Sequence, residues 1–206
     1  MKGKFIVFEG IDGSGSSYQA KLLQDHLIKH NQKSILTCEP TNGPIGSLIR
    51  QIQLGRTQIS EDDEKREKVL AYLFAADRMD HLVNDQNGII KSLEKGYNVI
   101  STRYTLSSFA YHTFNDDFSM IYALNKDFVK PDLLIYLDCP VEVSMDRINN
   151  TRIADLNENH ETLRRVKENY ETAIDILEYN YRRIDATKSP QLVFWDVLKI
   201  LNDIIN

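Results

Sequence analysis

The sequence predicts an α/β protein in which a parallel sheet is covered by helices on both faces, giving three layers. Strand-like apolar runs alternate along the chain with helical patterns, and this alternation favours parallel strands joined by helices. A glycine-rich segment, residues 10–17, directly follows the first apolar run, and polar clusters follow three later runs. Because such sheets bind ligands beyond the carboxyl ends of their strands, we expect a site at that edge.

Five strands are expected, joined by helical segments. The strand-like runs are Phe5–Phe8, Ser34–Thr37, Asn98–Ser101, Leu133–Leu137 and Gln191–Phe194. The longest helical region is expected from Glu61 to Leu93, where apolar residues are spaced for burial on one face. Within it Asp77 and Arg78 interrupt the apolar face, which is typical of a core helix with a surface ion pair.

Length and composition favour one globular domain spanning residues 1–206. The 206 residues are 42% hydrophobic and 27% charged, which suits a single domain with a sizeable core. A formal net charge of −5 argues against a non-specific nucleic-acid binder, so no nucleic-acid partner is expected. No apolar run approaches the roughly 20 residues that span a bilayer. The two cysteines suggest neither a disulfide framework nor a zinc site, so we expect a cytoplasmic protein without a membrane partner.

Residues 10–17 lie at an expected turn from strand to helix. Their glycines match the pattern G-x-x-x-x-G-K-[ST], in which backbone N–H groups and a helix N-terminus hold phosphates. Ser16 stands at the lysine position, whereas Ser17 supplies the hydroxyl that would face Mg²⁺. A glycine and serine run by itself is equally typical of a flexible turn. The expected phosphate-binding residues are Gly10, Gly13, Ser14, Gly15, Ser16 and Ser17.

Three polar clusters follow the next three expected strands. Glu39-Pro40-Thr41 follows the second, Thr102-Arg103-Tyr104 the third and Asp138-Cys139-Pro140 the fourth. The carboxyl ends of parallel strands lie at one edge, so these clusters are expected to converge there.

Nearly the whole chain resembles the thymidylate kinases. The string Leu73-Phe74-Ala75-Ala76-Asp77-Arg78 is very similar to one in the corresponding helix of that family. Further matching motifs are residues 5–15, Glu39-Pro40, Gly43-Pro44-Ile45-Gly46, Arg50, Arg103-Tyr104, Ser107-Ser108-Phe109-Ala110-Tyr111 and residues 131–138. The resemblance implies a nucleoside monophosphate kinase-like fold with a phosphate-binding loop. It also implies a homodimer that uses ATP and Mg²⁺ to phosphorylate dTMP to dTDP.

The resemblance assigns roles to residues that would bind dTMP. Phe74 would stack on thymine and Arg78 would donate to a base oxygen. Arg103 and Arg50 would hold the monophosphate, since a guanidinium matches phosphate oxygens. Taken singly, Phe74 could instead be a core residue and the arginines could form surface ion pairs.

Further residues complete the implied site. Asp12 would meet the sugar hydroxyl, and the other members would line the nucleotide pocket: Glu39, Pro40, Ser107, Ser108 and Tyr111. Any of these side chains could instead serve as a local cap or pack in the core. The expected catalytic residues are Glu9, Asp12, Arg103 and Arg152.

The chain departs from the family at the expected reaction centre. Ser16 replaces the loop lysine, Tyr18 a small hydroxyl residue, and Thr102 the aspartate before Arg103. Losing one preorganised charge contact costs about 10²–10³ in rate, so impaired catalysis is expected. A thymidine-nucleotide-binding protein without catalysis is the alternative, and a kinase for another nucleotide is a third.

A lid over ATP is expected at residues 149–160. Arg147, Arg152, Arg164 and Arg165 could supply its cations, although Leu156 stands where a lid arginine is expected. A polar loop whose arginines pair with nearby glutamates explains the segment equally well. Residues 186–190 correspond to an adenine-contacting loop or form a simple turn. The histidines His26, His30, His81, His112 and His160 lack metal-ligand spacing and are assigned no role.

Overall fold

The computed structural model confirms a parallel α/β sheet. It describes residues 2–113, 118–151, 159–177 and 179–205. The sheet has the strand order β2-β3-β1-β4-β5, and all of its pairings are parallel. The strand bounds are β1 Phe5–Glu9, β2 Ser34–Cys38, β3 Asn98–Thr102, β4 Leu133–Asp138 and β5 Tyr181–Asp185.

The central strand, β1, sets the position of the functional edge. Ile6 pairs with Ile100 of β3 on one side and with Leu133 of β4 on the other. Every residue of β1 is buried, as expected for a strand covered on both faces. The strand order reverses beside β1, so the segments that follow β1, β3 and β4 meet at a crevice.

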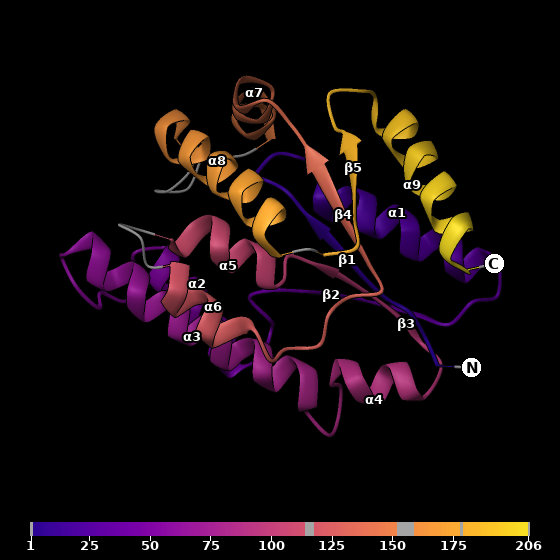
Figure 1. Cartoon of the computed structure of the whole chain (residues 1–206), viewed down its shortest axis with the longest axis horizontal. Coiled ribbons are helices and arrows are strands. Elements are labelled where there is room, and N and C mark those ends of the chain that lie inside the picture. The colour runs from indigo at the N-terminus through magenta and orange to yellow at the C-terminus, as the bar shows by residue number, and fades with distance from the viewer. Residues whose placement is uncertain (1, 114–117, 152–158, 178, 206) are drawn as a thin grey trace.

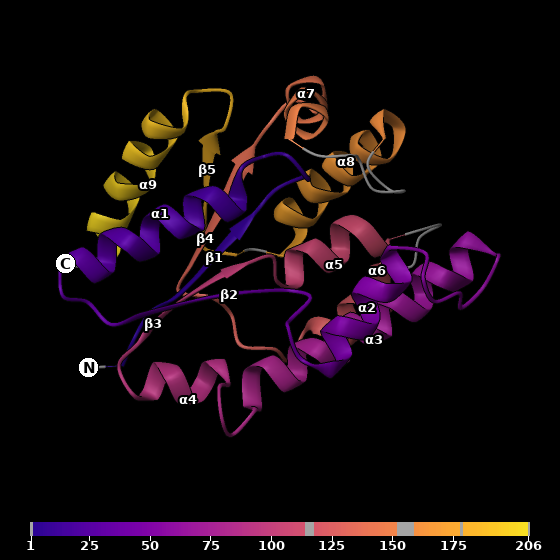
Figure 2. The ribbon, with the colours of Figure 1, turned by 180° about the vertical axis from the view of Figure 1, so that it is seen from behind.

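Helices cover both faces of the sheet (Figures 1 and 2). On one face α1 packs against β1, β2 and β3, and α9 packs against β5 and α1. On the other, α4 packs against β3, and α5 lies between α3 and α8. The helix bounds are α1 Ser16–Lys29, α2 Pro44–Gln53, α3 Asp63–Val83, α4 Ile89–Glu94, α5 Thr105–His112, α6 Phe118–Asn125, α7 Val141–Thr151, α8 His160–Leu177 and α9 Pro190–Ile205.

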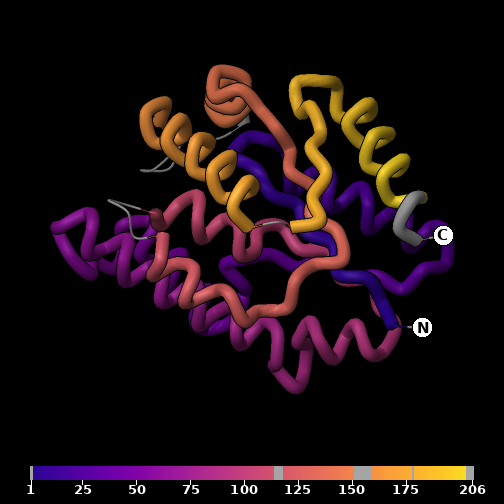
Figure 3. The backbone as a smooth tube through the Cα atoms, viewed as in Figure 1, coloured from indigo at the N-terminus to yellow at the C-terminus, as the bar shows by residue number. Residues whose placement is uncertain are grey.

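The backbone trace shows how distant parts of the chain meet (Figure 3). The indigo α1 and the yellow α9 pack side by side although they come from opposite ends of the sequence. None of the helices that the structure describes is long and apolar enough to cross a membrane.

The prediction for the fifth strand was wrong. Gln191–Phe194 belongs to α9, whereas the strand is β5, Tyr181–Asp185. Pro190 begins the helix, where its missing N–H costs no hydrogen bond. Val193 and Val197, one helical turn apart, are buried in the core, so their spacing suits a helix.

The predicted helical region from Glu61 to Leu93 is divided. α3 ends at Val83, a turn reaches Gly88, and α4 begins at Ile89. A side chain at Gly88 would lie 2.5 Å from the Asn84 carbonyl oxygen, so the turn requires a glycine. Of the predicted lid, residues 149–151 continue α7 and His160 begins α8. Residues 152–158, including the candidates Arg152 and Leu156, lie outside the described residues.

Candidate functional site

Residues 10–17 turn tightly from the end of β1 into the start of α1. Gly13 has a φ of 78°, and Gly15, which caps α1, has a φ of 95°, a region that glycine adopts readily. A Cβ on Gly13 would lie 2.6 Å from the Ser144 carbonyl oxygen, so this position also lacks room for a side chain. The loop therefore places backbone N–H groups and the positive end of α1 at the edge of the sheet, an arrangement that binds anions.

Arg147 of α7 is hydrogen-bonded to this loop. Its Nη1 donates to the carbonyl oxygens of Gly13 and Ser14, each at 3.4 Å, and its Nη2 donates to the Ala186 carbonyl oxygen at 2.7 Å. One side chain therefore connects the predicted adenine-contacting segment, residues 186–190, to the glycine-rich residues 10–17.

An open hollow of about 820 Å³, here called the loop hollow, lies over residues 12–19. Ser16, Tyr18 and Thr102, the three departures from the family pattern, all border it. The cationic residues that border it in the described chain are Arg50, Arg103, Arg147 and Lys188.

The loop hollow offers few ligands for a divalent cation. Ser17 borders it and is exposed on the first turn of α1. The parts of the chain that the structure describes contain no group of three His, Cys, Asp or Glu side chains placed to hold a metal. Mg²⁺ commonly binds through one or two carboxylates together with substrate phosphates. The two carboxylates that border the hollow, Asp12 and Glu39, are paired with Arg103 and Arg78. An ion at this site would therefore be held mainly by the Ser17 hydroxyl and by phosphate oxygens.

Arg103 follows β3 and lies against Asp12 and Tyr111. Its Nη2 forms an ion pair with Asp12 and donates to the Tyr111 hydroxyl at 2.9 Å, while that hydroxyl donates to Asp12 Oδ2 at 2.8 Å. The backbone of Arg103 has a φ of 66°, a conformation that costs a non-glycine residue about 1–3 kcal/mol. The surrounding contacts therefore hold this guanidinium in one place.

Glu9, at the end of β1, is fully buried and organises the start of α5. It accepts hydrogen bonds from the backbone N–H of Tyr104 at 2.8 Å and from the Ser107 and Tyr170 hydroxyls at 2.6 and 3.0 Å. Burial raises the pKa of Glu9 above its ordinary value, although its hydrogen bonds and the nearby Arg103 oppose the shift. Glu9 borders neither cavity, so its predicted catalytic role stays a prediction.

A second cavity, here called the inner cavity, has a volume of about 180 Å³. Most of the predicted dTMP-binding residues border it: Asp12, Glu39, Pro40, Phe74, Arg78, Arg103, Ser107, Ser108 and Tyr111. Arg50 is the exception among them. It borders the loop hollow, where it donates to the carbonyl oxygens of Pro40 and Thr41.

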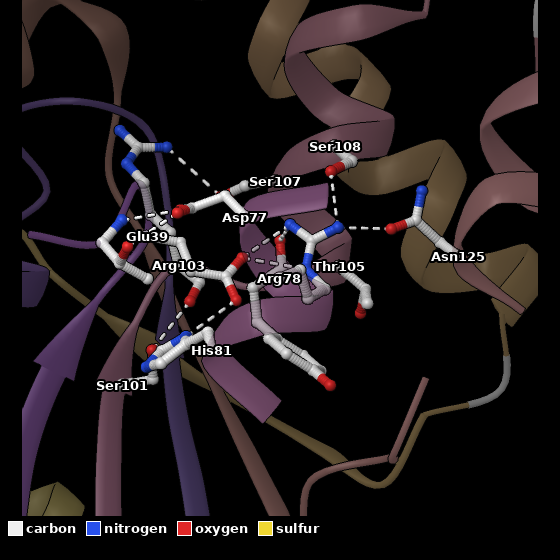
Figure 4. A network of polar contacts seen from close by, with 12 residues as sticks. Glu39, Asp77, Arg78, His81, Ser101, Arg103, Thr105, Ser107, Ser108 and Asn125 are labelled. Atoms are coloured by element: carbon white, nitrogen blue, oxygen red, sulfur yellow. Dashed lines mark hydrogen bonds and ion pairs between the residues drawn. The ribbon is translucent and has the colours of Figure 1, made fainter. Parts of the chain in front are cut away.

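Arg78 of α3 is buried in a network of polar contacts (Figure 4). Its Nε and Nη2 contact Glu39 Oε2 at 2.8 and 2.7 Å, and Nη2 also donates to the Tyr104 carbonyl oxygen. Its Nη1 donates to Ser108 Oγ at 3.0 Å and to Asn125. Four of its five N–H groups donate hydrogen bonds to protein acceptors, and Nη2 also takes part in the ion pair with Glu39. A bond from Arg78 to a base oxygen would therefore compete with these partners.

α3 also braces the segment that follows β2. Asp77 accepts hydrogen bonds from the backbone N–H and the hydroxyl of Thr41, at 2.7 and 2.6 Å, and His81 lies 3.1 Å from Glu39. The Asp77 and Arg78 side chains are buried, so the interpretation of a surface ion pair was wrong. Figure 4 shows both residues pointing into this network.

Phe74 borders the inner cavity beside residues to which the sequence analysis gave no role. Its ring centroid lies 5.0 Å from that of His112, and His112 Nδ1 lies 3.0 Å from Glu67 Oε2. Gln53 of α2 borders the same cavity. The sequence could have indicated His112 as a neighbour of the site, because His112 lies one helical turn after Ser108 on α5.

Comparison with known proteins agrees with this geometry. The family model described as thymidylate kinase matches residues 8–197. A protein of Thermococcus gammatolerans named probable thymidylate kinase is 39% identical over 204 residues, covering 97% of this chain and 96% of its own. A Methanococcus aeolicus protein of the same name is 40% identical over 173 residues, covering 84% and 80% of the two chains. The chain therefore belongs to the thymidylate kinase family.

Proposed function

We propose that the protein transfers the γ-phosphoryl group of ATP to dTMP and releases dTDP and ADP. The main support for this proposal is that the two cavities share part of their walls. The loop hollow and the inner cavity share Asp12, Glu39, Pro40 and Arg103 in their walls. A phosphate-binding loop on one side and an aromatic-lined cavity on the other suit two nucleotides whose phosphates meet at Arg103.

The proposed roles follow the two cavities. dTMP occupies the inner cavity, with its base on Phe74, its sugar near Asp12 and Tyr111, and its phosphate at Arg103. The ATP phosphates lie on residues 10–17. Mg²⁺, held by those phosphates and Ser17, would neutralise charge on the transferred group.

We propose that phosphoryl transfer is slow because two positions beside the reacting phosphates lack a charged side chain. Phosphoryl transfer depends mainly on alignment and on neutralising charge in the transition state. Neither Ser16 nor Thr102 is charged, although both border the loop hollow. Loss of one preorganised contact costs about 10²–10³ in rate.

The deciding measurement combines turnover with binding. A coupled assay of ADP release with dTMP and Mg²⁺-ATP, beside calorimetric titration of each nucleotide, should show dTMP binding and slow dTMP-dependent turnover. Absence of dTMP binding at millimolar concentration would remove the proposal.

Restoring the missing charge distinguishes a slow enzyme from a protein that does not catalyse the reaction. Ser16→Lys, alone and with Thr102→Asp, should raise the rate of dTMP phosphorylation more than it tightens ATP binding, because the charge is needed most in the transition state. Wild-type turnover of about 1–100 s⁻¹ that Ser16→Lys leaves unchanged would contradict the proposed impairment.

The second candidate function is binding of thymidine nucleotides without catalysis. The uncharged side chains of Ser16 and Thr102 in the loop hollow favour it. dTMP binding without turnover in both wild type and the double variant would establish this alternative.

We also propose a cytoplasmic homodimer. α3 carries exposed apolar side chains at Val69, Tyr72, Met79 and Val83, whose helical spacing places them on one face. A second copy could bury that face. Both cysteines are free, which agrees with a reducing compartment.

A further inference from the structure

The outer side of the edge strand β2 is open. In the sheet that the structure describes, β3 is its only neighbour. All five residues of β2 are half-buried, whereas every residue of the central strand β1 is buried. The sequence of β2, Ser-Ile-Leu-Thr-Cys, contains neither a charged residue nor a proline, which commonly keep an edge strand from pairing with another chain. β2 is therefore an unprotected edge.

The hydrogen bonds between β2 and β3 determine which backbone groups face the open side. At one end the Asn98 N–H donates to the Lys33 carbonyl oxygen at 2.9 Å, and at the other the Glu39 N–H donates to the Thr102 carbonyl oxygen at 3.0 Å. In a parallel pair, alternate residues of a strand bond to the same neighbour. Three residues of β2 therefore direct both their N–H and carbonyl groups away from β3: Ser34, Leu36 and Cys38.

A hollow of about 510 Å³, here called the edge hollow, adjoins this open side. Side chains from both faces of β2 border it, and successive side chains of a strand point to opposite faces. They are Ile35 and Thr37 on one face and Leu36 and Cys38 on the other. The edge hollow therefore extends around the edge of β2, where an added strand would lie.

The edge hollow carries an acidic side chain and no strongly basic one. Asp80 of α3 borders it and is half-buried, and its Oδ1 accepts a hydrogen bond from Asn84 at 3.0 Å. Neither a lysine nor an arginine borders the hollow in the described chain. His81 also borders it, but contacts Thr37 and Glu39 through its two ring nitrogens. The hollow therefore favours a cationic side chain over an anionic one.

We propose that β2 binds an extended segment of a partner protein as an additional strand, with a lysine or arginine of that segment beside Asp80. The outward backbone groups supply the hydrogen bonds of the new ladder, and the edge hollow receives the side chains. The strand β2 of a second copy carries no charge, so it would bring no cation of its own to Asp80. The interaction is independent of the proposed phosphoryl transfer and is measured without nucleotide.

The probe is a synthetic peptide, acetyl-Thr-Val-Thr-Lys-Thr-Val-Thr-amide, titrated into the full chain by calorimetry. A peptide with glutamate in place of lysine should bind about threefold more weakly or less tightly still, because its charge is repelled by Asp80. Asp80→Asn should remove this difference. The matched control Asp25→Asn, at an exposed site on α1, should leave it unchanged.

Two methylated isomers of the lysine peptide test the backbone pairing. One carries N-methyl groups on its two valines and the other on its two inner threonines. These nitrogens face opposite sides of an extended peptide, so only one isomer loses the donors that face β2. The two affinities should therefore differ about tenfold or more.

Amide hydrogen exchange locates the pairing on the protein. In the free protein the Leu36 N–H should exchange faster than those of Ile35 and Thr37, which face β3. Saturating lysine peptide should slow exchange at Leu36 about tenfold or more and leave the other two slow. Ser34→Pro removes an outward N–H without breaking the ladder to β3, so it should bind the peptide more weakly than the matched variant Ser34→Ala.

Several outcomes would overturn the inference. They are an absence of peptide binding at millimolar concentration, equal affinities of the two methylated isomers, and equal affinities of the lysine and glutamate peptides. A dimer that Ser34→Pro dissociates and Ser34→Ala does not would assign the edge to a second copy and also overturn it. If Ser34→Pro fails to fold, exchange at Leu36 in wild type decides the matter. None of these results bears on dTMP binding.

Discussion

At the scale of single residues, charged side chains of the candidate site are held in place by protein partners. Arg103 is held by Asp12 and Tyr111, and Arg78 by Glu39, Ser108 and neighbouring groups. Groups fixed in this way need little reorganisation when charge develops on a bound molecule. The fold therefore fixes the positions of both guanidinium groups.

Phe74 supplies the aromatic face of the proposed base site. Phe74→Ala should weaken dTMP binding by about 1–3 kcal/mol, the range for stacking of a base on an aromatic side chain. Calorimetry would measure this, with Phe194→Ala, a half-buried aromatic of α9, as the control. Equal dTMP affinity in wild type and Phe74→Ala would remove Phe74 from the site.

Glu9 should make the stability of the fold depend on pH. Burial raises its pKa in the folded state, so over a range above about pH 4.3 the folded protein retains a proton that the unfolded chain has lost. This contribution to the free energy of unfolding declines as pH rises through that range. Glu9→Gln should abolish the decline, so its stability relative to wild type should increase with pH.

Urea unfolding of both proteins between about pH 4 and about pH 8 would measure the difference. A stability difference that stays constant, or that changes in the opposite direction, would show that the Glu9 carboxyl is not the titrating group.

At the scale of elements, the four apolar strands were predictable and β5 was not. In the sheet that the structure describes, β5 is the edge strand beside β4, and its arginines, Arg182 and Arg183, are exposed. An edge strand of this kind lacks a continuous apolar run. The apolar residues at the start of α9 form such a run and were therefore predicted to be the strand.

Part of the site was predictable in the same way. Side chains that follow parallel strands lie at one edge of the sheet. This rule correctly placed Glu39 and Arg103 at that edge. Pairing across helices was not predictable, because one sequence does not show that Arg78 meets Ser108 or that His112 meets Glu67.

The glycine-rich residues 10–17 allow a matched test of backbone conformation. Gly13→Ala and Gly15→Ala both impose a positive φ on alanine, which costs about 1–2 kcal/mol. Only Gly13→Ala also collides with a backbone oxygen, since a Cβ on Gly15 meets nothing within 4 Å. Gly13→Ala should therefore lower the free energy of unfolding and ADP affinity further. Equal losses in the two variants would contradict the close contact with Ser144.

At the scale of the whole molecule, the exposed apolar face of α3 should pair with a second copy. Sedimentation at micromolar concentration should show a dimer, and Met79→Lys should shift it toward a monomer because a charge would be buried in the interface. Ile28→Lys, at an exposed site on α1, should leave the dimer intact. A wild-type monomer would remove the dimer proposal without affecting the fold.

The wall common to the loop hollow and the inner cavity has a thermodynamic consequence. Asp12, Glu39, Pro40 and Arg103 border both spaces, so a molecule that shifts this wall from one side alters it for a molecule on the other. If the two nucleotides occupy these spaces as proposed, we expect each to change the affinity for the other, because both would contact Arg103. By linkage, the factor by which ADP changes the affinity for dTMP equals the factor by which dTMP changes the affinity for ADP.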